Sequence, residues 1–321
     1  QGLEHYKSQE GCHEILRQLR RDVLDGYACF TVGETAMVDL PEARDLCEPE
    51  RRELNMLFYF DHLEVDRRVA RYVPKKFRAK NLLKVYTKWQ QGLSWNALYL
   101  ENHDQPRIVS RFGDEGEYRV HAAKMLGMVL HGMQGTPYIY QGEELGMTNV
   151  SFDRLEDYRD IETLNAYDEL VHTQGVDPKT MMQYIHHISR DNARTPMQWD
   201  DNCNAGFSCV TPWIGINPNY IRINAEQERG DPQSIYRYYQ KLIQIRKQYD
   251  IIVYGSYQLI YEDDPQIYAY TRTLENQKLL VICNFSEAPA EFVFPQEFRT
   301  DNKIELIANY EIDSIENDFR L

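Results

Sequence analysis

The stretch Tyr27-Ala28-Cys29-Phe30-Thr31-Val32-Gly33-Glu34 decides how this chain begins to fold. Its first six residues form a short, nearly continuous apolar run, which predicts a strand buried on both faces of a parallel sheet. Glu34 places a carboxylate at the C-terminal tip of that strand. An amphipathic helix of about four turns is expected before it, because apolar residues from Cys12 to Leu24 recur at spacings near three and four.

The same alternation continues along the chain. Polar residues follow the next strands, among them Glu101-Asn102-His103-Asp104 and Gln141-Gly142-Glu143-Glu144. Alternating strands and helices predict an α/β fold with parallel strands, whose functional side is the carboxyl edge of the strands. The expected strands are 54–60, 97–100 and 137–140, and the expected helices are 82–89 and 118–131.

The second half of the chain changes character twice. Residues 150–230 are rich in Asn, Asp, Arg, Gly, Pro and Trp and predict a long functional loop. A helix is expected next, with Asp231 as its N-cap and Pro232 at its first position. We therefore expect an α/β region over 1–250 and an antiparallel β domain over 251–321. The strands expected in that domain are 257–261, 266–273, 278–284, 291–294 and 303–307.

Composition narrows the class of partner. The chain has 36 Lys and Arg residues against 50 Asp and Glu, a formal charge of −14. Such a balance argues against nucleic acid or an anionic membrane as the main partner, because either needs a basic face. No apolar run approaches the length of a membrane span. The six cysteines show no metal-ligand pairing and predict reduced cytoplasmic thiols, although Cys203 and Cys209 could meet in a loop.

Glu34 and Asp104 are the strongest chemical candidates. A charged group at the end of a buried strand is costly unless it is used or paired. The structural alternative is a carboxylate that caps a helix or pairs with an arginine.

The residues around these carboxylates resemble the α-amylase superfamily, glycoside hydrolase family 13. The run ending at Glu34 is similar to the strand that carries the family's general acid/base, and Glu101-Asn102-His103-Asp104-Gln105-Pro106-Arg107 resembles its transition-state-stabilising segment. Two further runs resemble the oligo-1,6-glucosidase branch. These are Tyr140-Gln141-Gly142-Glu143-Glu144-Leu145-Gly146-Met147-Thr148-Asn149 and Ser189-Arg190-Asp191-Asn192-Ala193-Arg194-Thr195-Pro196-Met197-Gln198-Trp199.

The resemblance implies a (β/α)8 barrel followed by a β-sandwich. The four predicted strands would be the fifth to eighth of the barrel, so the chain is expected to be its C-terminal half. The family's nucleophile is an Asp in a Gly-x-Arg-x-Asp run, and these 321 residues contain no such run. The chain is therefore expected to need the N-terminal half of the same enzyme and to be inactive alone.

The resemblance also implies a role for each site residue. Glu34 would be the acid/base and Asp104 the transition-state stabiliser of a retaining α-glucosidase acting on short α-1,6 or α-1,4 glucosides. A strand tip walled by Phe, Tyr and Met is expected to desolvate Glu34. His103, Arg190 and Arg194 would bind the sugar, with the roles of the two arginines interchangeable, and Asn102, Glu143 and Glu144 would supply supporting hydrogen bonds. No metal or cofactor is implied.

Alternatives remain open. A trehalose-6-phosphate hydrolase would need a phosphate contact, for which a basic run is available, although a solvated loop also explains it. That run comprises Arg67, Arg68, Arg71, Lys75, Lys76, Arg78 and Lys80. A sucrose-isomerising relative is a further enzyme candidate, and a non-catalytic barrel scaffold is the alternative of another class.

Overall fold

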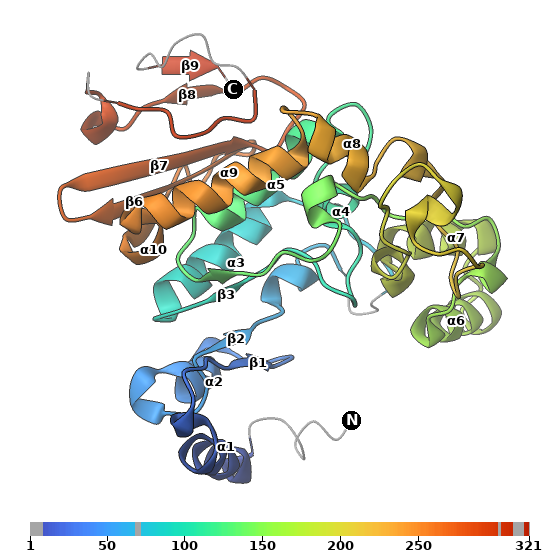
Figure 1. The fold of residues 1–321 in the computed structure, drawn as a ribbon, viewed down its shortest axis with the longest axis horizontal. Helices are drawn as coiled ribbons and strands as arrows, with labels where there is room; N and C mark the ends of the chain where they lie inside the picture. Colours follow the sequence, from blue (N-terminus) through green and yellow to red (C-terminus); the bar gives the residue numbers. More distant parts are fainter. Residues whose placement is uncertain (1–8, 68–71, 301–302, 311–317, 321) are drawn as a thin grey trace.

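The computed structural model describes residues 9–67, 72–300, 303–310 and 318–320 (Figure 1). The helices in these ranges are α1 (Glu10–Asp22), α2 (Leu40–Cys47), α3 (Ala79–Gly92), α4 (Ile108–Phe112), α5 (Arg119–His131), α6 (Ile161–Tyr167), α7 (Pro178–Ile188), α8 (Ala225–Gly230), α9 (Ile235–Gln248) and α10 (Asp250–Tyr254). The strands are β1 (Val32–Glu34), β2 (Met56–Phe58), β3 (Ala97–Leu98), β4 (Thr136–Pro137), β5 (Ser256–Ile260), β6 (Ile267–Leu274), β7 (Gln277–Asn284), β8 (Glu291–Val293) and β9 (Asp318–Arg320).

The parallel strands form two separate two-stranded sheets. β1 lies parallel to β2 and β3 parallel to β4, and within the described ranges no ladder joins the two pairs. In this part of the chain the four strands therefore do not form one hydrogen-bonded sheet, although β2 and β3 lie next to each other. The strands are also shorter than predicted. In the run before β1, Tyr27 and Phe30 are 73% and 63% exposed. An apolar run forms a buried strand only where neighbouring segments cover it, and these residues are not covered.

Helices predicted from periodicity are observed close to their expected positions. α1, α3 and α5 cover the predicted segments. On α3 the buried Trp89 stacks on Tyr59, with ring centroids 4.2 Å apart and planes 2° apart. α5 packs against α9 at Gly127, where an added Cβ would lie 2.8 Å from the ring of Tyr239, so this close approach requires glycine.

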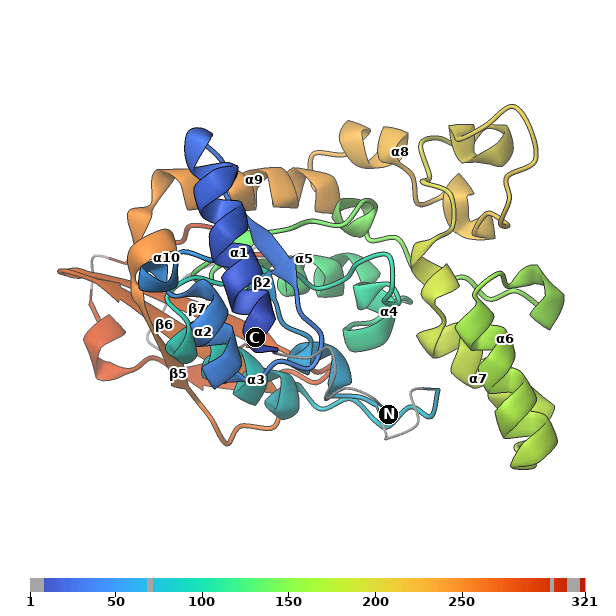
Figure 2. The same cartoon turned by 90° about the horizontal axis from the view of Figure 1, so that it is seen from below.

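The segment 150–230 is more regular than predicted. It contains α6, α7 and α8, and α6 and α7 form a lobe at the end of the molecule opposite the C-terminal strands (Figures 1 and 2). The lobe has its own apolar core, in which several side chains are buried against one another. The composition of this segment had indicated only a loop. The fully packed members of that core are Tyr72, Tyr158, Leu170, Met181, Ile185 and Ile188.

The start of α9 also differs from expectation. Its N-cap is Ser234, whose hydroxyl accepts a hydrogen bond from the Arg237 backbone N–H at 3.1 Å. Asp231 instead accepts from the Gln233 backbone N–H at 2.8 Å, closing a local turn before the helix. Asp and Ser are both good N-cap residues. The turn at Asp231 leaves only Ser234 next to the unpaired backbone N–H groups of the first helical turn.

The C-terminal strands form an antiparallel meander, as predicted, in the order β5-β6-β7. The strand expected at 303–307 is not observed, and β8 pairs with β9 instead. The meander is fastened to α5, because Tyr270 donates to the Val129 carbonyl at 2.9 Å and Arg272 donates to the Gly132 carbonyl at 2.8 Å. These carbonyls belong to the end of a helix, where the backbone lacks its own partners.

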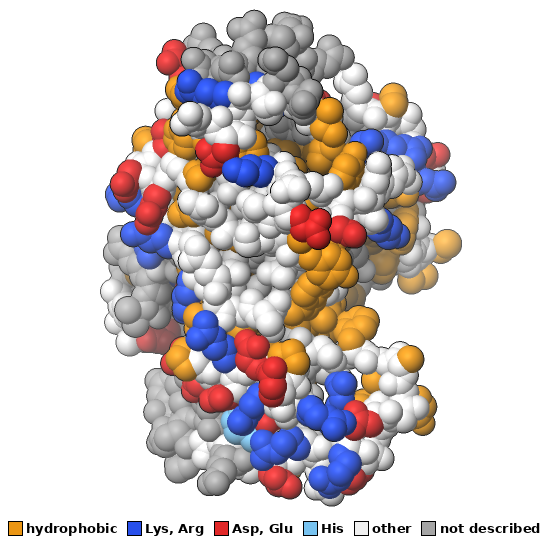
Figure 3. Space-filling view, turned by 90° about the vertical axis from the view of Figure 1, so that its left-hand side faces the viewer, with side chains coloured by type: hydrophobic (Ala, Val, Ile, Leu, Met, Phe, Trp, Pro, Cys, Tyr) orange, Lys and Arg blue, Asp and Glu red, His pale blue; other side chains and the backbone are white. Residues whose placement is uncertain are grey.

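The N-terminal elements project from this body. α1, α2, β1 and β2 lie at the bottom of Figure 1, and in Figure 3 the same part carries basic and acidic side chains intermixed. Large apolar side chains on this projection are more than two-fifths exposed, which is unusual for side chains that could form a core. They are Ile15, Leu19, Val23, Tyr27, Phe30 and Met37.

Candidate active site

The loop that follows β3 carries the central carboxylate of the site. Asp104 is held at the backbone, where its N–H donates to Asn102 Oδ1 at 2.8 Å. Glu101 anchors the loop from within, since its carboxylate accepts from Arg107 Nη1 at 3.2 Å and from the Ile108 N–H at 2.7 Å. Glu101 and Arg107 are both buried, so the loop has a fixed internal frame beneath an accessible Asp104.

Three predicted site residues gather around Asp104. Arg194 donates from Nη2 to Asp104 Oδ1 and from Nε to the His103 carbonyl at 2.9 Å. Arg190 Nη1 lies 3.7 Å from Asp104 Oδ1, and His103 Nε2 lies 3.7 Å from Asp104 Oδ2. The structure therefore brings Asp104, His103, Arg190 and Arg194 together from segments 90 residues apart.

Glu34 is placed elsewhere on the carboxyl side of the strands. It is the last residue of β1 and pairs in register with Phe58, whose ring packs edge-on against Tyr99 at a centroid distance of 5.0 Å. Burial, followed by the charges of Tyr86 and Glu34, raises the pKa of Tyr99, which comes directly after β3. Within the described residues, no hydrogen bond or ion pair joins Glu34 to the group around Asp104.

One expectation for Glu34 is corrected. The aromatic and methionine side chains of its strand were expected to bury the carboxylate, yet Glu34 is exposed. The strand occupies only Val32–Glu34, and the residues before it lie open to solvent. The side chains expected to wall off this carboxylate therefore do not enclose it in the described residues.

Asp160 is a site residue that sequence reasoning missed. It is the N-cap of α6, and its carboxylate binds Arg190 through Nη2 at 2.6 Å and through Nε at 3.1 Å. Arg194 Nη1 lies 3.9 Å from the same carboxylate. The available signal was the run Asp160-Ile161-Glu162, an acidic cap opening an apolar helix, but it gives no hint of the arginine partner.

The 3-10 turn after α7 fixes both arginines. Ser189 caps this turn, which spans Arg190–Ala193, and the buried Asp191 accepts from the Arg159 and Asp160 backbone N–H groups at 2.6 and 2.9 Å. Asp191 thereby ties the turn that carries Arg190 to the segment that carries Asp160.

Glu143 and Glu144 make internal hydrogen bonds in the loop after β4. Glu143 accepts from the Tyr239 hydroxyl at 2.9 Å and Glu144 from the Gly142 N–H at 2.8 Å. Burial, followed by the charge of Glu101, raises the pKa of Glu143 well above its ordinary value. Asn149 accepts from the Arg107 N–H at 2.8 Å, which joins the two strand-end loops.

The basic run is partly engaged within the protein. Arg68 and Arg71 lie outside the described residues. Arg67 donates to Gln105 at 2.6 Å and to Glu64 at 3.2 Å, and Lys80 pairs with Asp263 at 2.6 Å. The contacts of these two residues favour the interpretation of a structural loop over that of an open phosphate cradle.

Two other kinds of feature are absent from the described residues. Within the ranges that the structure describes, no cluster of three or more His, Cys, Asp or Glu side chains is arranged to hold a metal ion. No helix in those ranges has both the length and the apolarity needed to cross a membrane.

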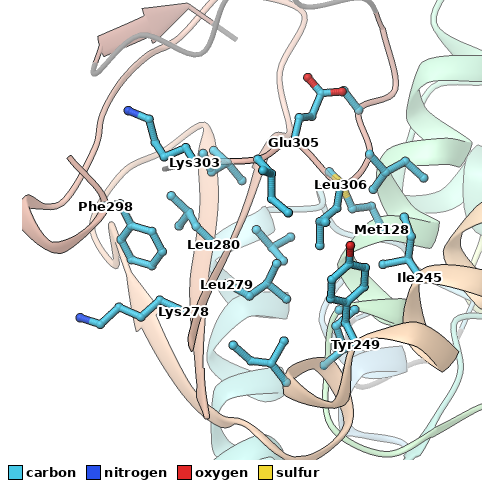
Figure 4. Close-up of a pocket in the computed structure, with 18 of the residues that line it drawn as sticks. Met128, Ile245, Tyr249, Lys278, Leu279, Leu280, Phe298, Lys303, Glu305 and Leu306 are labelled. Carbon is cyan, nitrogen blue, oxygen red and sulfur yellow. The ribbon is translucent and has the colours of Figure 1, made fainter. Parts of the chain in front are cut away.

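One cavity lies away from Asp104. It measures about 640 Å³ and lies between β7, the ends of α5 and α9, and residues 303–310 (Figure 4). Its wall is largely apolar, with Leu279, Ile245 and Leu306 facing inward and Lys278 and Lys303 at its edge. None of the predicted site residues lines it.

Comparison with known proteins identifies the class. The family model described as Alpha amylase, catalytic domain, matches residues 2–255, and that described as Maltogenic Amylase, C-terminal domain, matches residues 257–321. The chain therefore belongs to the α-amylase family of glycoside hydrolases.

Individual relatives refine this placement. The chain is 54% identical over 319 residues to an oligo-1,6-glucosidase from Parageobacillus thermoglucosidasius, covering 98% of this chain and 57% of the relative. A crystal structure of a Bacillus licheniformis trehalose-6-phosphate hydrolase superposes with a TM-score of 0.94 at 43% identity, covering 100% of this chain and 59% of that one. An isomaltulose synthase from Klebsiella sp. LX3 gives a TM-score of 0.90 at 36% identity, covering 96% and 56%. The chain thus spans somewhat over half the length of these relatives.

These comparisons correct the expected fold class. A chain limited to strands five to eight of a barrel was predicted, whereas the catalytic-domain model matches residues 2–255 and a solved relative covers the whole chain. The findings support a TIM-barrel-like catalytic region followed by a C-terminal domain. The assignment to strands five to eight came from the motif resemblance, and motifs at a few strand ends do not fix how much of the catalytic domain a chain matches.

Proposed function

We propose that the enzyme carrying this chain is a retaining α-glucosidase that releases glucose from the non-reducing end of short α-1,6-linked glucosides and, secondarily, α-1,4-linked ones. The observation that carries this proposal is the convergence of Arg194, Arg190 and His103 on Asp104 at the end of β3. The 54% identity to an oligo-1,6-glucosidase supports the choice of linkage.

In this proposal Asp104 stays ionised and stabilises the positive charge that develops on the sugar. An oxocarbenium-like transition state is the common feature of retaining glycosidases. Groups held in advance at the point where charge develops stabilise the transition state more than the substrate. His103 and one of the two arginines would donate to sugar hydroxyls.

Glu34 is the proposed general acid/base. It would protonate the leaving glycosidic oxygen and later take a proton from the attacking water. Its exposure in the described residues means that bound substrate, or protein contributed from outside these residues, must supply the desolvated surroundings of that step.

The nucleophile of a retaining mechanism must come from outside the described site. Because no Gly-x-Arg-x-Asp run occurs in the 321 residues, the chain by itself is proposed to be inactive. The N-terminal half of the same enzyme is the proposed partner, and the apolar side chains on the projecting N-terminal elements, such as Ile15 at 66% exposure, support a docking surface there. Neither nucleic acid nor a membrane is proposed as a partner, given the net charge of −14.

A cytoplasmic location and two domains are also proposed. Six unpaired cysteines suit a reducing compartment. A boundary near residue 250 is supported by the family models, which meet between residues 255 and 257.

The test of function is Glu34→Gln in the complete enzyme. Turnover of isomaltose should fall by at least about 10³-fold while competitive binding of glucose is retained, because the acid/base is lost but the sugar pocket is not. Glu50→Gln, an exposed carboxylate on the same projection, is the matched control and should leave turnover unchanged. Unchanged activity in Glu34→Gln would remove Glu34 from the proposed role.

Trehalose-6-phosphate hydrolysis is the second candidate, favoured by the structural superposition at a TM-score of 0.94. A substrate panel of isomaltose, trehalose-6-phosphate, trehalose and sucrose separates the enzyme candidates. Absence of turnover and of glucose binding in the complete enzyme would favour the non-catalytic scaffold.

A further inference from the structure

The Arg190 guanidinium is committed to Asp160 rather than to Asp104. Arg190 makes three short contacts with Asp160, from Nη2 to Oδ1 at 2.6 Å and from Nε to both carboxylate oxygens at 3.1 Å. Its approach to Asp104 is longer, 3.7 Å from Nη1 to Oδ1. Asp160 is 1% exposed and Asp104 is 32% exposed, so one carboxylate is enclosed and the other is accessible.

Asp160 is itself held in place by the protein. The Tyr72 and Thr163 hydroxyls donate to Oδ2 at 3.2 and 3.1 Å, and the Glu162 N–H donates to Oδ1 at 3.2 Å. Burial alone raises the pKa of Asp160, but the hydrogen bonds and charge of Arg190 outweigh it and leave this pKa below its ordinary value. Hydrogen bonding to Asp160 in turn raises the pKa of Arg190, so the pair is ionised at neutral pH.

The four charges alternate around the site. Arg194 binds Asp104 and lies 3.9 Å from Asp160, while Arg190 binds Asp160 and lies 3.7 Å from Asp104. Two aspartates and two arginines sum to zero charge. Glu162, which lies 3.7 Å from Arg190, and His103, beside Asp104, are 44% and 61% exposed and are therefore more strongly screened by solvent.

We propose that Asp160 is a positioning residue of the glucosidase site, which anchors Arg190 and cancels its charge so that Arg190 does not offset the negative charge that Asp104 presents to the sugar. This inference rests on the proposed function. The developing charge on the sugar is positive. Without Asp160, the same four positions would carry a net charge of +1 beside that developing charge, and Arg190 could turn toward Asp104.

A pair of ligands tests this role in the complete enzyme. Glucose is neutral, and the iminosugar 1-deoxynojirimycin is a glucose analogue that carries a positive charge when protonated. In Asp160→Asn the affinity for the iminosugar should fall at least about tenfold more than the affinity for glucose, because only the charged ligand senses the lost carboxylate. For isomaltose, kcat should fall by more than KM rises.

Three further variants sharpen the result. Asp160→Glu restores the charge and should restore most of the iminosugar preference. Arg190→Gln leaves a net charge of −1 and should shift the preference in the opposite direction, which tests the charge argument even if Asp160→Asn does not fold. Asp157→Asn removes an exposed carboxylate from the same segment and should change neither affinity.

An equal loss of both affinities in a folded Asp160→Asn variant, or no change in either, would show that Asp160 has only a structural role and would overturn the proposal. Binding of both ligands by the wild type separates this failure from failure of the proposed function. If the wild-type enzyme bound neither ligand, the proposed function would fail and this inference with it.

Discussion

Tyr239 on α9 donates its hydroxyl to the buried carboxylate of Glu143 at 2.9 Å. This hydrogen bond joins the long helix that precedes the C-terminal sheet to the loop after β4. Both side chains are almost fully enclosed, so neither can exchange this partner for water.

Removal of this hydroxyl should destabilise the fold. Tyr239→Phe leaves Glu143 buried with one donor fewer, and we expect the free energy of unfolding to fall by about 1–3 kcal/mol, measured by urea unfolding. Tyr236→Phe on the same helix is the control, because no hydrogen bond of its hydroxyl is found in the described residues. A Tyr239→Phe variant as stable as the wild type would show that this hydrogen bond does not contribute to stability.

The buried glutamate should make stability depend on pH. The pKa of Glu143 is raised above its ordinary value of 4.5, so above pH 4.5 the folded state holds a proton that the unfolded state has released. This contribution to stability is complete below pH 4.5 and is lost as pH rises toward the folded pKa. Glu143→Gln abolishes the titration, and its stability relative to wild type should increase between pH 5 and pH 8.

Chemical unfolding at several pH values measures this difference. Glu117→Gln, an exposed residue, is the matched control and should follow the wild type at every pH. A Glu143→Gln curve parallel to the wild-type curve would refute a raised pKa at this residue.

A buried ion pair beneath the Asp104 loop should be costly to break from one side. Arg111 binds Asp66 through Nε at 2.8 Å and Nη2 at 2.5 Å, and both residues are buried. Asp66→Asn strands a buried positive charge and should cost about 3–5 kcal/mol. The double variant Asp66→Leu/Arg111→Met should recover most of that loss, because neither charge then remains.

A double-mutant cycle followed by urea unfolding measures the coupling between the two residues. Breaking the exposed Arg154–Asp157 pair, at 2.8 Å, serves as comparison and should have little effect. Additive losses at Asp66 and Arg111 would contradict the expected coupling.

A methyl group at Gly132 should separate α5 from the meander. An added Cβ would lie 2.2 Å from the Tyr270 hydroxyl and 3.1 Å from Val281. We expect Gly132→Ala to lower the unfolding free energy by about 1–3 kcal/mol, with partial recovery in Gly132→Ala/Tyr270→Phe. Gly230→Ala, where nothing lies within 4 Å, is the control, and thermal unfolding is the measurement.

The sequence predicted the helices well, and it predicted the lengths and pairing of the strands poorly. α3 and α5 were found because helical spacing is a property of neighbouring residues alone. The length and pairing of β1 were not, because a strand extends only where another segment covers it, and Tyr27 and Phe30 remain exposed.

The candidate site shows the same division. Asp104, His103, Arg190 and Arg194 were predicted through motif resemblance, and the structure places them together. Asp160 was missed because its importance lies in contact with Arg190, 30 residues away, and nothing in its own surroundings in sequence indicates that contact.

The hydrogen bonds between the meander and α5 affect how the chain unfolds. Tyr270 and Arg272 occupy the carbonyls that would otherwise end α5 unpaired, so the terminal sheet completes a helix that precedes it by more than a hundred residues. Because these hydrogen bonds join α5 to the meander, unfolding of either region breaks them and destabilises the other. Severing the backbone between α10 and β5 would thus yield a nicked but associated particle, and heating the intact chain would melt both regions in one cooperative calorimetric transition.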